Sequence, residues 1–391
     1  MTATTAEERS SRALTRLTWL LGAMLAGEAA LFAILAPLLP ELKRDLELTT
    51  TQAGLLAGVF SAGFAVGAVA AGVLATRLGG KRTVLLGLLL LGVTSAAFAV
   101  VDDYAPMFAV RAAQGMAGSA VWAGSLTWVA AAAPPNRRPQ ALGVVLGLGI
   151  AGTLLGPILG AVALETSIAA VFGGIAVATV AGALVMAREP GARVRWDGAP
   201  AQALRRRGRV VMGAMWLVLL PSAGMGVLIG LMPLRLDRLG VGSSAIAAVF
   251  AAAGVLEAGM SPVAGRAIAR FGLEPVTSFA VVVGIALFVA LALPAGGVAV
   301  GLLVCACAAA VGSFWVPGSV RLHALAERDI IADGAAFSLF SIAFAGGVML
   351  GASGSAAVAD ATSEALPCLA LAGLFALTLA RRIHSHGARH M

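Results

Sequence analysis

Long apolar stretches recur along the whole chain, and polar residues gather in the short segments between them. Most stretches reach about 20 residues, the length that a helix needs to cross the roughly 30 Å hydrocarbon core of a membrane. They are continuously apolar and do not alternate with a period of two, so they predict spanning helices rather than strands. The twelve predicted spans cover residues 17–39, 52–76, 83–101, 106–133, 140–163, 166–187, 209–234, 244–268, 275–293, 296–322, 333–358 and 361–380.

The composition agrees with a chain built from membrane helices. Of its 391 residues, 60% are hydrophobic and 12% are charged, whereas soluble domains carry roughly 25% charged residues. The 49 glycines suit helices that approach one another closely within a bilayer. The sequence therefore predicts an all-α, multi-pass protein of the plasma (inner) membrane, with the lipid bilayer as its surroundings.

Lysine and arginine are distributed unevenly among the segments that join the spans. If the first residue lies in the cytoplasm, 22 of the 27 basic residues fall on the cytoplasmic side and 4 on the opposite side, while Arg111 lies within a span. The positive-inside rule then places the N- and C-termini in the cytoplasm. The net charge of +8 is interpreted as a signal of topology, and nucleic acid is not expected as a partner.

No sequence pattern indicates an enzyme, a cofactor or a metal site. Cys305, Cys307 and Cys368 fall within spans, where cysteine usually serves as a small buried apolar residue. The chain has neither a phosphate-binding P-loop pattern nor an arrangement typical of a hydrolase. Any transport against a concentration gradient would therefore draw on an ion gradient rather than on ATP.

The longest polar stretch divides the spans into two groups of six. It predicts a first bundle over 1–187, a linker over 188–208 and a second bundle over 209–391. A shift of 193 residues aligns landmarks of the two bundles and indicates a tandem repeat with a pseudo-two-fold axis. The aligned pairs are Pro40 and Pro233, Gly72 and Gly265, Arg77 and Arg270, Gly79 and Gly272, and Trp122 and Trp315. Such repeats place a substrate site near the membrane midplane, between the halves.

The loop between the second and third spans reads GVLATRLGGKR. It resembles the signature of the major facilitator superfamily, roughly G-x-L-A-D-R-x-G-R-K, with Thr76 where the family has an acid. The resemblance implies a loop that gates the cytoplasmic mouth, without the charge that usually latches it to the other half. The alternative is a generic basic loop. The residues expected to form the gating loop are Gly72, Thr76, Arg77, Gly79, Lys81 and Arg82.

The fourth span contains VRAAQGMAG, which resembles the R-x-x-Q-G motif of the same family. The resemblance implies that Arg111, beside Gln114, takes part in proton coupling. An arginine within a span costs about 2.5 kcal/mol or more, which also favours a functional role. The alternative is that Arg111 extends toward the outer surface of the membrane.

The fifth span reads GVVLGLGIAGTLLGPILGA and resembles the antiporter signature of drug exporters in this superfamily, with Ala161 in place of its final glycine. We expect its glycines to lie tightly against a neighbouring helix, in the other half. The proline removes a backbone hydrogen bond and loosens the helix. The alternative is ordinary packing of small residues. The motif residues are Gly143, Gly152, Gly156, Pro157 and Gly160.

Two acids, Glu28 and Glu257, lie deep within predicted spans. An ionised carboxylate at that depth is costly, so each is expected to hold a proton until water or a cation reaches it. Glu28 is the candidate coupling site and Glu257 a second proton site. The alternatives are a neutral Glu28 bonded to a neighbouring helix, and a Glu257 paired with a polar group between the halves.

By the same resemblance, spans 1, 4, 7 and 10 line the cavity. Aromatic faces beside an acid suit a bulky, lipophilic and often cationic ligand. The alternative for the tryptophans is packing or anchoring at the membrane interface. The predicted cavity residues are Trp122, Trp128, Trp315, Gln114 and Met24.

The sequence as a whole favours a proton-coupled, multidrug-type antiporter that exports lipophilic or cationic small molecules by alternating access. Its expected partners are a small-molecule substrate and protons, and it is expected to act as a monomer. One alternative is a proton-coupled importer of a small metabolite. Another is a membrane receptor on the same fold that transports nothing.

Overall fold

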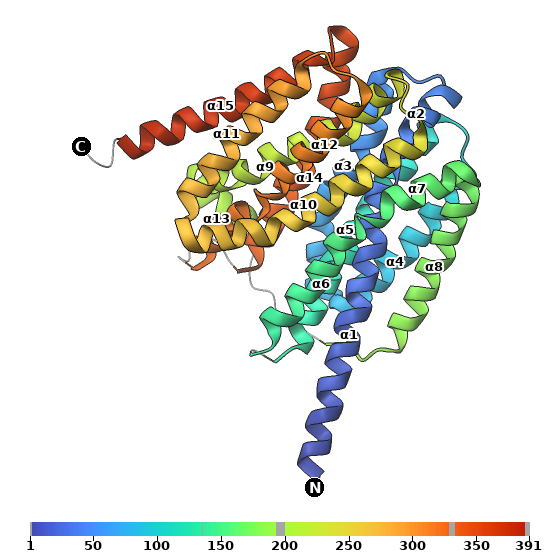
Figure 1. Ribbon diagram of the computed structural model, residues 1–391. Helices are drawn as coiled ribbons and strands as arrows, with labels where there is room; N and C mark the ends of the chain where they lie inside the picture. Colours follow the sequence, from blue (N-terminus) through green and yellow to red (C-terminus); the bar gives the residue numbers. More distant parts are fainter. Residues whose placement is uncertain (1, 135, 193–199, 328–332, 388–391) are drawn as a thin grey trace. The chain divides into compact units, whose positions relative to one another are not determined.

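The computed structural model describes residues 2–134, 136–192, 200–327 and 333–387 (Figure 1). This part of the chain consists of helices without strands. The helices are α1 (Thr2–Ala33), α2 (Leu35–Asp45), α3 (Thr50–Leu78), α4 (Gly80–Phe98), α5 (Tyr104–Ala132), α6 (Arg138–Gly152), α7 (Leu155–Glu165), α8 (Ile168–Arg188), α9 (Pro200–Arg238), α10 (Ser243–Phe271), α11 (Leu273–Ala292), α12 (Gly297–Gly312), α13 (Trp315–Glu327), α14 (Asp333–Ala361) and α15 (Ala365–Gly387).

Eleven helical segments of the described chain are long and apolar enough to cross a membrane. They correspond to eleven of the twelve predicted spans. The remaining prediction, 106–133, corresponds to α5, which has the length of a span but carries Arg111, Gln114 and several hydroxyl side chains. The all-α prediction is therefore confirmed. The polar residues of α5, several of them buried, explain why it is less apolar than the other spans.

The helices form two compact units. Unit 1 comprises Met1–Leu35 and Ala62–Trp196, and unit 2 comprises Ala36–Ser61 and Asp197–Met391. The second unit thus includes α2 and the first half of α3, which the sequence had assigned to the first bundle. The predicted linker 188–208 falls partly outside the described residues, at 193–199.

In unit 1, α4 packs along α5 and α8, and α1 packs along α6. Leucine, valine and Trp128 side chains fill the core between α1, α4 and α5. In unit 2, α14 packs along α9, α10 along α12, and α11 along α15. The stacked rings of Phe288 and Phe375 lie in the core of that unit, and Phe314 packs against Phe375.

Three predicted spans are broken within their length, and each break lies shortly before a proline. The breaks separate α1 from α2 before Pro37, α6 from α7 before Pro157, and α12 from α13 before Pro317. Proline has no N–H to donate to the carbonyl four residues earlier, so the helix is weakened there. The expectation that Pro157 loosens its helix agrees with the break at residues 153–154.

A left-handed glycine begins the third helix of each repeat. Gly79 has φ +84° and precedes α4, and Gly272 has φ +86° and precedes α11. A side chain is unfavourable in this backbone region, which explains why the two glycines recur 193 residues apart. The second residue after each glycine lies in the first turn of the helix. It is Lys81 in α4 and Glu274 in α11.

Lys81 and its neighbours form a polar clamp at this end of unit 1. Lys81 Nζ donates to the carbonyl oxygens of Ala187 (2.7 Å) and Glu189 (2.5 Å) at the end of α8. Trp128 Nε1 donates to Pro190 O at 3.1 Å. Arg16 pairs with the Glu189 carboxylate at 2.7 Å. The clamp therefore ties α1, α4 and α5 to the segment that follows α8.

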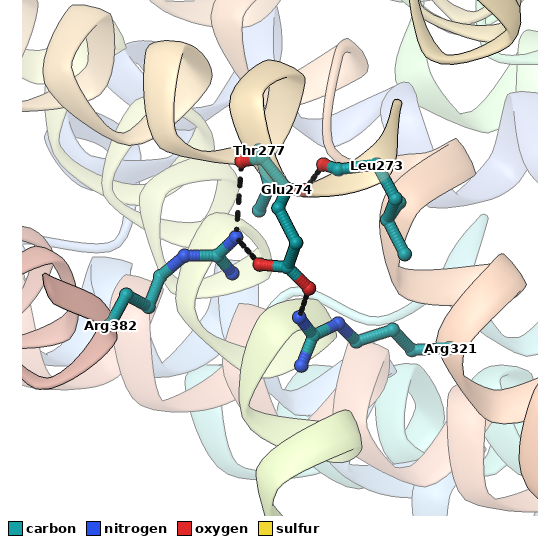
Figure 2. A network of polar contacts seen from close by, with 5 residues as sticks. All are labelled: Leu273, Glu274, Thr277, Arg321 and Arg382. Atoms are coloured by element: carbon teal, nitrogen blue, oxygen red, sulfur yellow. Dashed lines mark hydrogen bonds and ion pairs between the residues drawn. The ribbon is translucent and has the colours of Figure 1, made fainter. Parts of the chain in front are cut away.

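Glu274 forms the corresponding clamp in unit 2 (Figure 2). Its carboxylate accepts from Arg321 of α13 and from Arg382 of α15. Arg382 also donates to the backbone oxygen of Glu274 at 3.2 Å, and Thr277 Oγ1 donates to Leu273 O at 2.6 Å. One carboxylate thus joins the ends of three helices.

Near the end of α2, further polar contacts hold residues 36–61 within unit 2. Arg44 pairs with Asp237 of α9 at 2.8 Å, and these residues are themselves 193 positions apart. Both the backbone N–H and the hydroxyl of Thr51, in the first turn of α3, donate to Asp360 of α14 at 2.6 Å. Asp360 therefore caps a helix that begins far away in the sequence.

Candidate functional site

Glu28 is buried in unit 1, with 3% of its surface exposed. It lies on α1, and its Oε2 accepts a hydrogen bond from Trp122 Nε1 of α5 at 2.5 Å. An indole N–H can only donate, so it stabilises the carboxylate where it stands. The structure thus joins the predicted coupling residue and a predicted cavity residue by one hydrogen bond.

Arg111 lies on the same helix as Trp122 and is completely buried. Its Nη1 donates to the carbonyl of Leu31 (3.1 Å) and to Oε1 of Gln114 (2.9 Å). Arg111 and Glu28 also attract each other electrostatically. The alternative that Arg111 extends to the membrane surface is wrong, because its side chain points into the protein.

Gln114 extends the network to a third helix. It is also completely buried, and its Nε2 lies 3.4 Å from Ser95 Oγ of α4. The network around the Glu28 carboxylate and the Arg111 guanidinium therefore includes groups from α1, α4 and α5. Such a pair is neutral as long as the carboxylate is ionised, and a proton on Glu28 leaves it with one positive charge.

The helical spacing of α5 explains how these residues meet. Arg111, Gln114, Gly118 and Trp122 follow one another at intervals of three or four residues, which places them on one face of the helix. The motifs of the sequence indicated three of them singly but neither Gly118 nor the shared face. Ser95 and the Leu31 carbonyl could not be predicted, because a single sequence offers no signal for them.

The glycines of the fifth span pack against α1, the helix that carries Glu28. A Cβ at Gly152 would collide with the backbone of Ala26, and one at Gly156 would meet the side chain of Ala33. The prediction that these two glycines approach the other half is therefore wrong. Gly143 has no atom within 4 Å of the place of its Cβ, and Gly160 is buried in α7.

Two predicted cavity residues pack inside unit 1 instead. Trp128 is fully buried, and its N–H takes part in the clamp at Pro190. Met24 lies one turn before Glu28, but its sulfur faces α8, where a Cβ on Gly182 would be 2.7 Å away. Neither side chain contacts Glu28 through a hydrogen bond.

The second unit contains the remaining candidates. Glu257 lies in the middle of α10, where its backbone is in close contact with Gly312 of α12. Trp315 is the first residue of α13, directly after the proline-associated break. The side chain of Trp315 lies outside the described part of the structure.

The gating-loop residues take different places at the end of α3 and the start of α4. Thr76 Oγ1 donates to Val73 O of its own helix at 2.8 Å. Lys81 is committed to the clamp, and Arg77 and Arg82 are exposed. Gly72 has open space at the position of a Cβ. Among these residues, Arg77 and Arg82 are the basic side chains that remain exposed.

The polar network does not recur in the second repeat. The positions 193 residues after Glu28, Arg111 and Gln114 are occupied by Pro221, Val304 and Cys307. The last two are buried in the apolar core of unit 2. The Glu28, Arg111 and Gln114 network is therefore a feature of unit 1 alone among the described residues.

A family model described as the Major Facilitator Superfamily matches residues 21–352. The chain belongs to the Major Facilitator Superfamily. It is thus a membrane transporter of that superfamily, and the resemblance inferred from the loop and the fourth span is confirmed.

Curated relatives of this superfamily member match over part of their length. The quinolone resistance protein NorA of Staphylococcus aureus (strain MRSA252) is 29% identical over 134 residues, which is 34% of either chain. The hexuronate transporter of Bacillus subtilis (strain 168) is 30% identical over 129 residues, or 33% of this chain and 31% of that protein. Each alignment thus spans about a third of the relative.

Solved transporter structures share the fold over nearly the whole length of this chain. The xylose transporter XylE from E. coli gives a TM-score of 0.71 at 14% identity, over 94% of this chain and 97% of that one. A bacterial homologue of the human lysosomal transporter Spinster gives 0.77 at 12% identity, over 96% of each chain. These likenesses confirm the predicted major facilitator fold.

Proposed function

We propose that this transporter exports lipophilic or cationic small molecules in exchange for protons. The observation that carries the proposal is the buried carboxylate of Glu28, which receives the Trp122 N–H within reach of the Arg111 charge. Ionisable residues within membrane spans are costly and usually mark the path of an ion or a substrate. A carboxylate can exchange a proton for a cation without further chemistry.

In the proposed cycle, Glu28 binds a proton when the site faces one side of the membrane and releases it when the site faces the other. A cationic substrate competes with the proton for the same carboxylate. Arg111 stabilises the ionised form between these events, and Trp122 holds the carboxylate in place. Rocking of the two repeats alternates the access of the site, as in other transporters built from repeats.

Two observations favour export of drug-like substrates. The glycine pattern of α6 and α7 resembles the signature of drug exporters and packs on the helix of Glu28. The partial similarity to a quinolone resistance protein makes quinolones the first compounds to test. We further propose a monomer in the plasma membrane with both termini in the cytoplasm, and bundles over 1–187 and 209–391 joined by 188–208.

A second candidate is a proton-coupled importer of a small metabolite. The partial similarity to a hexuronate transporter favours it. Inside-out vesicles distinguish the two directions, because an exporter loads them when their lumen is acidified. Loading of a hexuronate into right-side-out vesicles, with no loading of quinolones into inside-out vesicles, would establish import.

The coupling role is tested by Glu28→Gln, which keeps the shape of the side chain but cannot ionise. Addition of substrate to the wild-type protein in weakly buffered detergent is expected to release protons, and the variant is expected to release none. Gradient-driven transport should be lost with it. Glu165→Gln, at the exposed end of α7, is the matched control. Proton release and transport at wild-type levels in Glu28→Gln would exclude Glu28 as the coupling site.

A further inference from the structure

Gly118 lies one turn before Trp122 on α5 and faces the carboxyl group of Glu28. A Cβ at this position would collide with Oε1 of Glu28 and would approach its Cδ and Cγ to 3.0 Å. The three nearest atoms all belong to Glu28. The missing side chain thus provides the space that one carboxylate oxygen occupies, while the other accepts from Trp122.

Gly149 of α6 lies against the six-membered part of the Trp122 ring, at Cη2 and Cζ2, on the side of the indole that carries Nε1. A Cβ there would be 3.1 Å from Cη2 and 3.3 Å from Cζ2 of the indole, and 3.2 Å from Cβ of Leu25 on α1. Contacts this short leave no room for a methyl group unless the ring or α1 moves. The α6 backbone therefore limits the movement of the ring that donates to Glu28.

We propose that Gly118 and Gly149 are positioning residues that hold Glu28 and Trp122 in their hydrogen-bonded arrangement. Gly118 makes the space for the carboxylate, and Gly149 makes the space for the ring that donates to it. Gly149 stands outside the glycine pattern by which the fifth span resembles drug exporters. The inference rests on the proposed role of Glu28 as the coupling carboxylate.

A side chain at either position has a defined consequence. A methyl group at Gly118 pushes the carboxylate out of its place, and one at Gly149 pushes the indole. Both changes disturb the hydrogen bond between Trp122 Nε1 and Glu28 Oε2, so the ionised carboxylate is stabilised less. Proton release from Glu28 then becomes harder, although neither glycine touches a proton or a substrate.

A double-mutant cycle tests the space around the carboxylate. Gly118→Ala is expected to lower the Tm of the full-length protein in detergent, even though alanine is the better helix former. In a Glu28→Ala background the same substitution is expected to leave the Tm unchanged or to raise it, because the colliding atoms are gone. An equal loss of Tm in both backgrounds would overturn the assignment of Gly118.

Trp122 itself reports on the arrangement. Its emission is obtained as the difference between the wild-type protein and Trp122→Phe, and we expect it to titrate with pH because its N–H is bonded to Glu28. Gly118→Ala and Gly149→Ala are expected to shift the midpoint of this titration and to lower the rate of transport about tenfold, the effect of losing one hydrogen bond to a charged group. Gly147→Ala, whose Cβ meets no atom within 4 Å, is the control.

The outcomes separate this inference from the proposed function. If Gly118→Ala and Gly149→Ala are folded and titrate like the wild-type protein, the two glycines do not position the pair. If Glu28→Gln abolishes the titration of Trp122 but leaves gradient-driven transport intact, the proposed function fails while the positioning stands. Loss of both the titration and transport in Glu28→Gln, with shifted midpoints in the glycine variants, supports both.

Discussion

At the scale of single residues, two positions one turn apart on α1 meet one face of α5. Glu28 accepts from Trp122, and the carbonyl of Leu31 accepts from Arg111. Burial of a charged side chain within a span costs about 2.5 kcal/mol or more. The Gln114 amide and the Leu31 carbonyl offset part of that cost for Arg111, and the nearby carboxylate offsets more.

Arg111→Lys separates the charge of this residue from its shape. Lysine keeps the positive charge but has no planar fork, so it cannot reproduce the bonds to Leu31 and Gln114. We expect normal expression and a rate of transport lowered about tenfold or more. Transport by reconstituted vesicles measures the effect. Full activity of the lysine variant would show that the charge alone is required.

The sequence predicted the positions of these residues but not their contacts. Apolar length and the spacing on α5 are properties of single helices, so both can be predicted from one chain. The partner of the fifth span is a contact between helices, which hydropathy does not encode, and its prediction was wrong for Gly152 and Gly156. The grouping of residues 36–61 with unit 2 likewise depends on contacts between helices, which hydropathy does not encode.

At the scale of helices, proline divides some spans and leaves others continuous. Pro37, Pro157 and Pro317 follow breaks, whereas Pro221 and Pro262 lie inside unbroken helices. Every proline removes one N–H, so the sequence indicates where a helix is weak. Whether the helix breaks at that place depends on how the neighbouring helices pack against it, which the sequence alone does not show.

Pro157→Ala restores the missing N–H and allows a bond to the carbonyl of Thr153. We expect a continuous helix through α6 and α7, a higher Tm and slower transport, because the helix next to Glu28 loses a flexible point. Thermal unfolding and transport assays on the same preparation measure both effects. A lower Tm together with unchanged transport would show that the break is only a consequence of packing.

At the scale of the whole chain, the polypeptide leaves unit 1 and returns to it within residues 36–61. The first of these crossings lies beside the break between α1 and α2. A flexible point and a change of unit therefore coincide. The rocking motion proposed above would involve this crossing, and the contact between Arg44 and Asp237 holds the segment beyond it.

Exchange of the charges at this contact tests its role. Arg44→Asp is expected to change the Tm little, because exposed ion pairs contribute only about 0–1 kcal/mol, but to change the rate of transport by up to about fivefold. The double variant Arg44→Asp with Asp237→Arg is expected to restore the rate. Failure of the double variant to recover would assign the effect of the single one to another contact.

The two clamps described above carry opposite charges at equivalent places in the repeat. Lys81 and Glu189 in unit 1 correspond to Glu274 and Arg382 in unit 2. A newly made chain with two similar halves can dock a helix of one half onto the wrong partner from the other. Such an exchange would set Lys81 beside Arg382, or Glu274 beside Glu189, and like charges repel. We therefore expect the reversed polarity to favour docking of each half on its own helices while the protein assembles.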